Sequence, residues 1–297
     1  MKPAPFAYHR PASVDDALAL LRTHGADAKP LAGGQSLIPA MNFRLARPAV
    51  LVDLNGIAAL AYVRDAPDGL RIGAMARQRA VERDPAVGRA APLLAEALPH
   101  VAHAQIRNRG TIGGSVAHAD PAGEIPAVLL ALDARFEVRG PGGARTVPAE
   151  RFFTGLFATA LAPGELLVEI AVPAMAARTG WAFLEVARRH GDYALAGVAT
   201  TVTLDEAGRC RAARIALLGV GDGPVLARRA AKTLAGEAPT DKVLREAAGV
   251  AAAKDVDPPG DIHASAAYRR QLVAVLARRA LATACERAAA RGAGPGS

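Results

Sequence analysis

The 297-residue chain has little of several features that mark particular classes of protein. Its only cysteines, Cys210 and Cys285, lie far apart, so there is no CxxC pair, no ligand set for an iron–sulfur cluster and no disulfide framework. No apolar run reaches the roughly 20 residues of a membrane-spanning helix, and the N-terminus MKPAPFAYHRP lacks a signal peptide's hydrophobic core. We therefore expect a cytoplasmic protein whose redox chemistry, if any, comes from an organic cofactor or a partner.

Aromatic residues and concentrated charge are also scarce. Aromatic side chains make up 4% of the chain, and the formal net charge of +8 comes from arginines spread over many segments. Nucleic-acid binding usually needs a dense basic patch, with aromatic side chains among it where bases stack. The composition therefore disfavours a nucleic-acid partner.

What is present is enough apolar sequence, 51%, for a sizeable core, and a length beyond one average domain. A capping-box-like SVDD with apolar residues on one face predicts a helix that begins near Ser13 and ends at Gly25. Further helices are expected at 78–84, 93–100 and 123–132, and strands at 29–32, 49–54, within 60–75, at 134–140 and at 168–173.

The segment PAMAARTG, residues 173–180, is the best candidate for a linker. Three strands (181–187, 198–204 and 213–220) and then three helices (226–235, 241–253 and 265–290) are expected after it. Strands followed by helices without strict alternation predict an α+β fold with a three-stranded antiparallel sheet in the C-terminal part. We predict domains at 1–176 and 177–290, with residues 291–297 as a flexible tail.

Two paired-glycine stretches stand out, AGGQS at 32–36 (the first glycine motif) and TIGGS at 111–115 (the second glycine motif). Glycine tolerates positive φ, so each pair is expected to form a turn that points successive backbone N–H groups at one anion. Two such sites, with Gln, Thr and Ser side chains as further donors, suit the two phosphoryl groups of a nucleotide diphosphate. Ordinary turns remain the alternative, because neither stretch matches the dinucleotide GxGxxG or the phosphate-binding GxxxxGK[ST].

AGGQSLIPAM followed by TIGGSVAHADPAGEIPAVLLALDA closely resembles the FAD-binding (medium) subunit of the molybdenum hydroxylases, the carbon monoxide dehydrogenase and xanthine dehydrogenase family. The resemblance spans nearly the whole chain and includes RRHGDYALAGVA at 188–199. It implies a two-subdomain FAD-binding domain of the PCMH type, followed by a smaller α+β domain that helps to cover a noncovalently bound flavin.

The resemblance also implies which residues hold FAD. Both glycine motifs would contact the diphosphate through Ala32, Gly33, Gly34, Gln35, Ser36, Thr111, Ile112, Gly113, Gly114 and Ser115. Glu124 would lie near the adenosine end, and Leu161 and Tyr193 beside the isoalloxazine ring.

Several of these residues have a second, purely structural interpretation. Asp120 could contact the ligand or cap the following helix, and Glu124 could simply favour a helix N-terminus. Leu161 and Tyr193 could be core residues. Where xanthine dehydrogenase-type relatives have a lysine near the ring, this chain has Leu184 and Glu185, which argues against NAD reduction.

By the same resemblance, the chain relays electrons and needs no catalytic residue of its own. Molybdopterin on a large subunit and two [2Fe–2S] clusters on a small subunit would feed the FAD, in a dimer of heterotrimers, and an external acceptor would take the electrons. One alternative is a self-contained flavin oxidoreductase acting directly on a small substrate. Another is a colourless basic binding protein. His100, His103 and His118 have no completing ligands in the sequence, so we expect no metal site.

Overall fold

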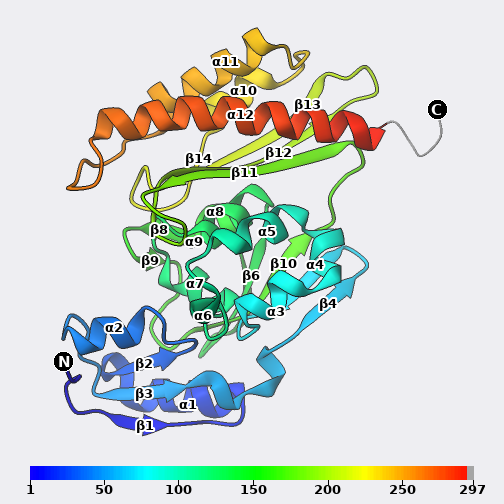
Figure 1. Ribbon diagram of the computed structural model, residues 1–297. Helices are drawn as coiled ribbons and strands as arrows, with labels where there is room; N and C mark the ends of the chain where they lie inside the picture. The colour runs from blue at the N-terminus through cyan, green and yellow to red at the C-terminus, as the bar shows by residue number, and fades with distance from the viewer. Residues whose placement is uncertain (293–297) are drawn as a thin grey trace.

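The structure is a computed structural model that describes residues 1–292, in which three main β-sheets follow one another along the chain (Figure 1). The N-terminal sheet is parallel, with strand order β1-β3-β2. Its elements are β1 (Ala7–His9), α1 (Val14–His24), β2 (Ala28–Leu31), α2 (Leu37–Asn42) and β3 (Val50–Asp53). The predicted first helix is confirmed: Ser13 Oγ accepts a hydrogen bond from Asp16 N at 3.1 Å, and Gly25 ends the helix at φ 53°.

The second sheet is antiparallel, with order β4-β5-β10-β6-β7. Its strands are β4 (Val63–Ala66), β5 (Gly69–Gly73), β6 (Arg135–Gly140), β7 (Gly143–Pro148) and β10 (Leu166–Pro173). The helices between its strands are α3 (Gln78–Arg83), α4 (Pro85–Ala90), α5 (Pro92–Ala97), α6 (Ala104–Arg107), α7 (Ile112–His118), α8 (Glu124–Ala131) and α9 (Ala149–Phe152). A small hairpin joins β8 (Phe153–Gly155) to β9 (Ala158–Thr159).

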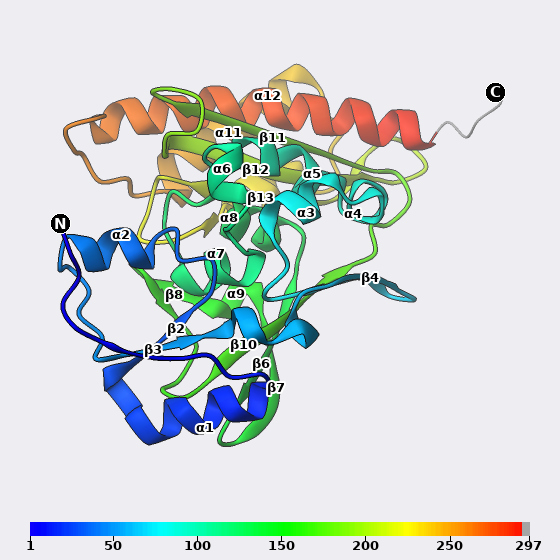
Figure 2. The same ribbon diagram turned by 60° about the horizontal axis from the view of Figure 1, so that its bottom comes forward.

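The third sheet is antiparallel, and both of its faces are covered by helices. Its strands are β11 (Thr179–Ala187), β12 (Ala194–Leu204), β13 (Cys210–Leu218) and β14 (Val225–Leu226). The helices that follow are α10 (Arg228–Leu234), α11 (Asp241–Val250) with a π-helical turn at Ala251–Asp255, and α12 (Ala266–Gly292). Alternate residues of β12 face two separate cores, one shared with α5 and α8 and one shared with α10 to α12. Figures 1 and 2 both show α12 along the outer face of this sheet.

The α+β class and the two-part architecture are confirmed, and the structure differs from the expectations in detail. The C-terminal sheet has a fourth strand, because the two residues of β14 add to the expected three. The second glycine motif begins helix α7 instead of forming a turn. The predicted tail starts too early, since α12 runs to Gly292; residues 293–297 lie outside the described part of the chain.

The carboxylate of Glu96, on α5, joins the N-terminal part to the C-terminal sheet and to α12. Its oxygens accept hydrogen bonds from Phe183 N at 2.9 Å, Trp181 Nε1 at 3.1 Å and Arg287 Nη1 at 2.6 Å. Phe183 and Ala199 of the C-terminal sheet also lie in the same apolar core as α8. The two parts therefore pack as one body through both apolar and charged contacts.

The closest approach of β11 to α12 depends on Gly180. A Cβ at Gly180 would lie 1.9 Å from the Ala284 carbonyl oxygen and 2.5 Å from Ala288 N. We expect Gly180→Ala to lower the free energy of unfolding by about 1–3 kcal/mol, because the helix must move away from the strand. Urea unfolding followed by circular dichroism measures this change.

Gly249→Ala is the matched control. Gly249 lies inside α11 with no atom within 4 Å of an added Cβ. Because alanine favours the helix, this variant should be stabilised by about 0.5–1 kcal/mol. Equal effects of the two substitutions would contradict the close-approach explanation.

Candidate functional site

The two glycine motifs, 75 or more residues apart in sequence, lie side by side in the structure. A Cβ at Gly33 would lie 2.4 Å from the Arg109 carbonyl oxygen and 2.7 Å from Gly110 Cα. A Cβ at Gly114 would lie 3.4 Å from Ala32 Cβ. The chain that leads into the second motif therefore packs directly on the first.

The first glycine motif is a loop between β2 and α2 with unused hydrogen-bond donors. Within residues 1–292, no protein acceptor pairs with the backbone N–H groups of Gly33, Gly34, Gln35 and Ser36. Only Gly34 has the expected positive φ, 76°, whereas Gly33 is required by its close neighbours. The motif lines a cavity of about 470 Å³, together with Tyr8, Asp53, Asn55 and Arg109.

The second glycine motif differs from the expected turn, because its backbone donors are already used. Ile112 N donates to Ala76 O at 3.0 Å and Gly113 N to Ala74 O at 2.9 Å. Gly114 N donates to Thr111 Oγ1 at 3.0 Å, which makes Thr111 the N-cap of α7. The expectation that successive N–H groups here point at an anion is therefore wrong.

Two hydroxyl groups of the second motif keep a free hydrogen. Thr111 Oγ1 accepts from Gly114 N, and Ser115 Oγ accepts from Gln78 Nε2 at 3.0 Å. Since both oxygens act as acceptors within the protein, each O–H can still donate to a ligand. The first motif thus offers backbone donors and the second offers side-chain donors.

Two arginines beside the motifs, Arg77 and Arg109, were not predicted from the sequence. Arg77 donates to the carbonyl of Arg109 and to Asn55 Oδ1, and Asn55 Nδ2 donates to Ala32 O at 2.9 Å. These contacts link the first motif to the segment that precedes the second. Neither guanidinium forms an ion pair with a carboxylate among residues 1–292, and desolvation followed by the charge of Arg109 lowers the pKa of Arg77. The position of Arg109, two residues before Thr111, was the only signal in the sequence.

Asp120 and Glu124 follow the C-terminal end of α7, a helix about 10 Å long at 1.5 Å per residue. Asp120 Oδ1 accepts from Ala122 N at 2.9 Å, so it stabilises the turn before α8, whose N-cap is Gly123. Asp120 therefore does not cap α8, and the helix-capping interpretation of this residue is wrong. Glu124 is the first residue of α8, as the macrodipole interpretation requires, but only 8% of it is exposed.

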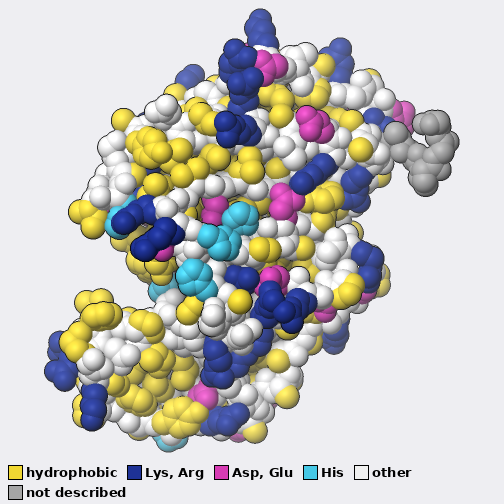
Figure 3. All heavy atoms as spheres, viewed as in Figure 1, with side chains coloured by type: hydrophobic (Ala, Val, Ile, Leu, Met, Phe, Trp, Pro, Cys, Tyr) yellow, Lys and Arg dark blue, Asp and Glu magenta, His cyan; other side chains and the backbone are white. Residues whose placement is uncertain are grey.

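Glu124, Glu185 and His100 form an acid–histidine cluster where the C-terminal sheet meets the N-terminal part. His100 Nδ1 lies 3.3 Å from Glu185 Oε1, and the hydrogen bond that the protonated ring donates to this carboxylate raises the pKa of His100. Burial, and then the charge of Glu185, raises the pKa of Glu124 to about 8. Figure 3 shows histidine and acidic side chains gathered in the hollow between the lower and upper parts of the molecule.

Tyr193 lies near this cluster on the loop between β11 and β12. It is 70% exposed, while desolvation of its hydroxyl and the charges of Asp120 and Glu124 raise its pKa. Leu161 is instead half-buried and packs against the large core beneath α8, which agrees with its structural interpretation. Asp120 and Glu124 therefore act electrostatically on Tyr193, and Leu161 lies at the edge of the core.

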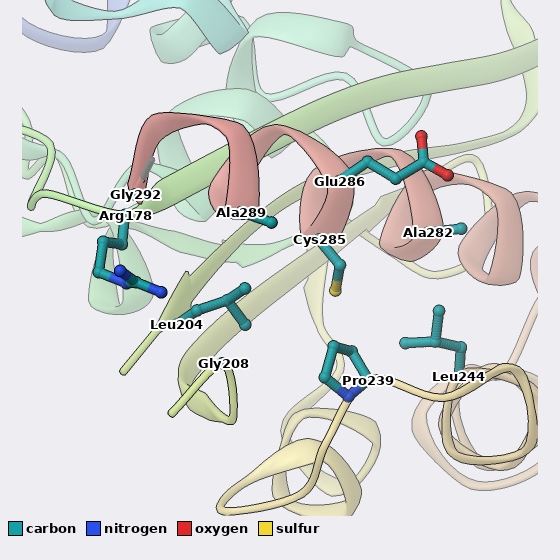
Figure 4. Close-up of a pocket in the computed structure, with 10 residues that line it drawn as sticks. All are labelled: Arg178, Leu204, Gly208, Pro239, Leu244, Ala282, Cys285, Glu286, Ala289 and Gly292. Atoms are coloured by element: carbon teal, nitrogen blue, oxygen red, sulfur yellow. The ribbon is translucent and has the colours of Figure 1, made fainter. Parts of the chain in front are cut away.

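A second cavity, of about 570 Å³, lies in the C-terminal domain beneath α12 (Figure 4). Its walls are mostly apolar, and Cys285 points into it. Burial raises the pKa of Cys285 to about 12 and that of Cys210 to about 11, so neither thiol ionises at neutral pH. Its lining also includes Arg178 and Glu286, and neither glycine motif contributes to it.

Two kinds of feature are absent from residues 1–292. No three His, Cys, Asp or Glu side chains converge in a way that could hold a metal ion. No described helix combines the length and apolar character of a membrane span.

The raised pKa of Glu124 makes stability depend on pH. Between about pH 4.5 and about pH 8 the folded state holds a proton that the unfolded state has lost, so stability falls as pH rises. Glu124→Gln cannot ionise, and we expect it to exceed the wild type in stability by a few kcal/mol near pH 8, at about 1.4 kcal/mol per pKa unit. Urea unfolding near both ends of this window measures the difference.

Glu150→Gln provides a control of opposite sign. Hydrogen bonds from Arg228 and then Arg214 lower the pKa of Glu150, so its charged form stabilises the fold at neutral pH and this contribution is lost on acidification. The Glu150→Gln variant should therefore be less stable than the wild type at neutral pH. If both variants changed stability in the same direction there, the assignment of Glu124 would be wrong.

Comparison with known proteins agrees with the sequence resemblance. The family described as the FAD binding domain in molybdopterin dehydrogenase matches residues 4–175, and the CO dehydrogenase flavoprotein C-terminal domain matches residues 181–284. The chain is 44% identical to the 6-hydroxypseudooxynicotine dehydrogenase complex subunit alpha of Paenarthrobacter nicotinovorans, over 97% of each chain.

The carbon monoxide dehydrogenase medium chain of Hydrogenophaga pseudoflava is 41% identical, over 97% of this chain and 100% of that one. A solved structure of carbon monoxide dehydrogenase from the same organism superposes with a TM-score of 0.94 at 42% identity, covering 97% of this chain and 99% of that chain. The chain therefore belongs to the family of FAD-binding medium subunits of the molybdenum hydroxylases.

Proposed function

We propose that the two glycine motifs and Arg109 jointly bind the diphosphate of FAD. The observation that carries this proposal is the packing of Gly33 against Arg109 and Gly110, which brings the segment before the second motif against the first motif and puts Arg109 in the first motif's cavity. Free N–H groups of the first motif and free O–H groups of Thr111 and Ser115 suit two phosphoryl groups. A side chain at Gly33 would collide with this arrangement, so the residues present fit the cofactor.

We further propose that the isoalloxazine ring lies toward the far end of α7. Tyr193 is an exposed aromatic side chain there, and its ring can stack on the cofactor. The charge of Glu124 contributes to the raised pKa of Tyr193, and we propose that both residues lie at the flavin end of the extended dinucleotide. This placement assigns Glu124 to the flavin end instead of the adenosine end, and as a protonated carboxyl it can donate a hydrogen bond.

The family membership supports the role of an electron-transfer subunit. Bound FAD exchanges electrons singly or in pairs, which connects one-electron carriers to a two-electron acceptor. The chain's own residues bind and orient the cofactor. In this proposal, residues 1–176 form the FAD-binding domain, and residues 177–290 form the domain that helps to cover the flavin. We propose a large molybdopterin-binding partner and a small [2Fe–2S] partner, in a cytoplasmic dimer of heterotrimers.

Arg109→Gln tests the diphosphate site. Loss of a charged hydrogen bond of about 1.5–3 kcal/mol should raise the Kd for FAD about 10- to 100-fold. Titration of the apoprotein with FAD, followed by fluorescence quenching, measures this.

Arg139→Gln removes the same charge from an exposed position on β6 and should leave the Kd unchanged. If both variants weakened FAD binding equally, the effect would come from the net charge of the protein and not from a contact of Arg109 with the cofactor. A wild-type protein that holds no FAD would overturn the proposed function itself.

The self-contained oxidoreductase remains the second candidate, because Tyr193 and Glu185 are titratable groups near the proposed ring position. The relay function predicts that small oxidisable substrates leave the flavin of the isolated subunit oxidised. The same substrate should reduce it once the large and small subunits are added. Anaerobic absorbance spectra would decide, and direct reduction of the isolated subunit would favour the second candidate.

A further inference from the structure

The cavity beneath α12 lies in the C-terminal domain and has no part in the proposed function. Its walls come from the turn before β11, the turn between β12 and β13, the loop before α11, and the helices α11 and α12. At about 570 Å³ it falls within the usual size range of small-molecule sites. Its apolar lining includes Leu204, Leu244 and Cys285, which suits the apolar body of a small ligand (Figure 4).

Arg178 brings a positive charge to one end of this cavity, and its guanidinium is turned toward the interior (Figure 4). The buried Arg178 Nε has no hydrogen-bond partner among residues 1–292, and the guanidinium forms no ion pair with a carboxylate of these residues. An arginine cannot lose its proton in a protein, and a buried polar group without a partner is costly. A bound anion would supply the counter-charge that this part of the chain does not.

The local structure fixes the position of Arg178. Its backbone has φ 57°, which is uncommon for a residue with a side chain, and its carbonyl accepts a hydrogen bond from Leu204 N at 3.0 Å. A Cβ at Gly292 would lie 2.6 Å from Arg178 Nη1, so the guanidinium packs directly on the C-terminal end of α12. The partial negative charge of this helix end is a purely structural alternative for placing a cation here.

The other polar groups of the lining do not repel an anion from the interior. Glu286 is exposed, and its carboxylate points away from Arg178 and from the Cys285 thiol (Figure 4). Burial keeps Cys285 in its neutral form at neutral pH. The charge that faces the interior is therefore positive, and it favours an anionic ligand over a cationic one.

We propose that the cavity beneath α12 binds a small monocarboxylate with an apolar body. The carboxylate pairs with Arg178, because a guanidinium can donate two parallel hydrogen bonds to its two oxygens. The apolar body lies against Leu204, Leu244 and Cys285. This cavity shares no lining residue with the cavity of the first glycine motif, so the monocarboxylate site is independent of the proposed FAD site.

Isothermal titration calorimetry of the full chain with octanoate, 1-octanol and octylammonium tests this proposal, because the three probes share an apolar body and differ in charge. Octanoate should bind with one-to-one stoichiometry and about 10-fold or more tightly than the other two probes. Arg178→Gln removes a charged hydrogen bond, so it should raise the Kd for octanoate about 10- to 100-fold and leave the Kd for 1-octanol nearly unchanged. Cys285→Leu fills the cavity and should weaken the binding of both probes.

Arg279→Gln is the matched control, because it removes the same charge from an exposed position on α12 outside the lining of the cavity. It should bind octanoate like the wild type. Octanoate that binds no more tightly than 1-octanol or octylammonium would overturn the proposal, as would equal weakening by Arg178→Gln and Arg279→Gln. Unchanged octanoate binding by Cys285→Leu would place the ligand elsewhere and overturn it too. If Arg178→Gln failed to fold, the three probes and Cys285→Leu would still decide, and none of these outcomes depends on FAD.

Discussion

The arrangement of the site depends on one close contact between backbones, at Gly33. Its Cα faces the Arg109 carbonyl and Gly110 with no room for a side chain. Through this contact the loop between β2 and α2 of the N-terminal part meets the segment just before α7. Helix α7 lies in the chain between strands β5 and β6 of the second sheet. The hydrogen bonds from Arg77 to Arg109 and to Asn55 hold the same junction from the other side.

Charge is distributed unequally along α7. Arg77 and Arg109, without carboxylate partners in the described chain, lie near its N-terminus with the free donors of the first motif. Asp120 and the acid–histidine cluster lie near its C-terminus. An extended cofactor with an anionic middle would meet positive charge at one end of the helix and the buried carboxyl group of Glu124 beyond the other.

Local signals in the sequence predicted the elements well, and long-range contacts explain what they missed. The cap at Ser13 and the stop at Gly25 predicted α1 because both act within a few residues. Gly113 and Gly114 suggested a turn because glycine tolerates positive φ, yet Gly113 is needed in α7, where a Cβ would lie 2.5 Å from Ala74 Cβ. The electrostatic effect of Glu124 on Tyr193 and the unpartnered oxygen of Glu185 depend on packing between the two parts of the chain, which no local pattern in the sequence predicts.

The central claim is that both glycine motifs contact one diphosphate, and a crystal structure of the chain with FAD tests it most directly. The account predicts phosphate oxygens within hydrogen-bond distance of the amides at 33–36 and of the hydroxyls of Thr111 and Ser115. Density for the diphosphate away from either motif would contradict it.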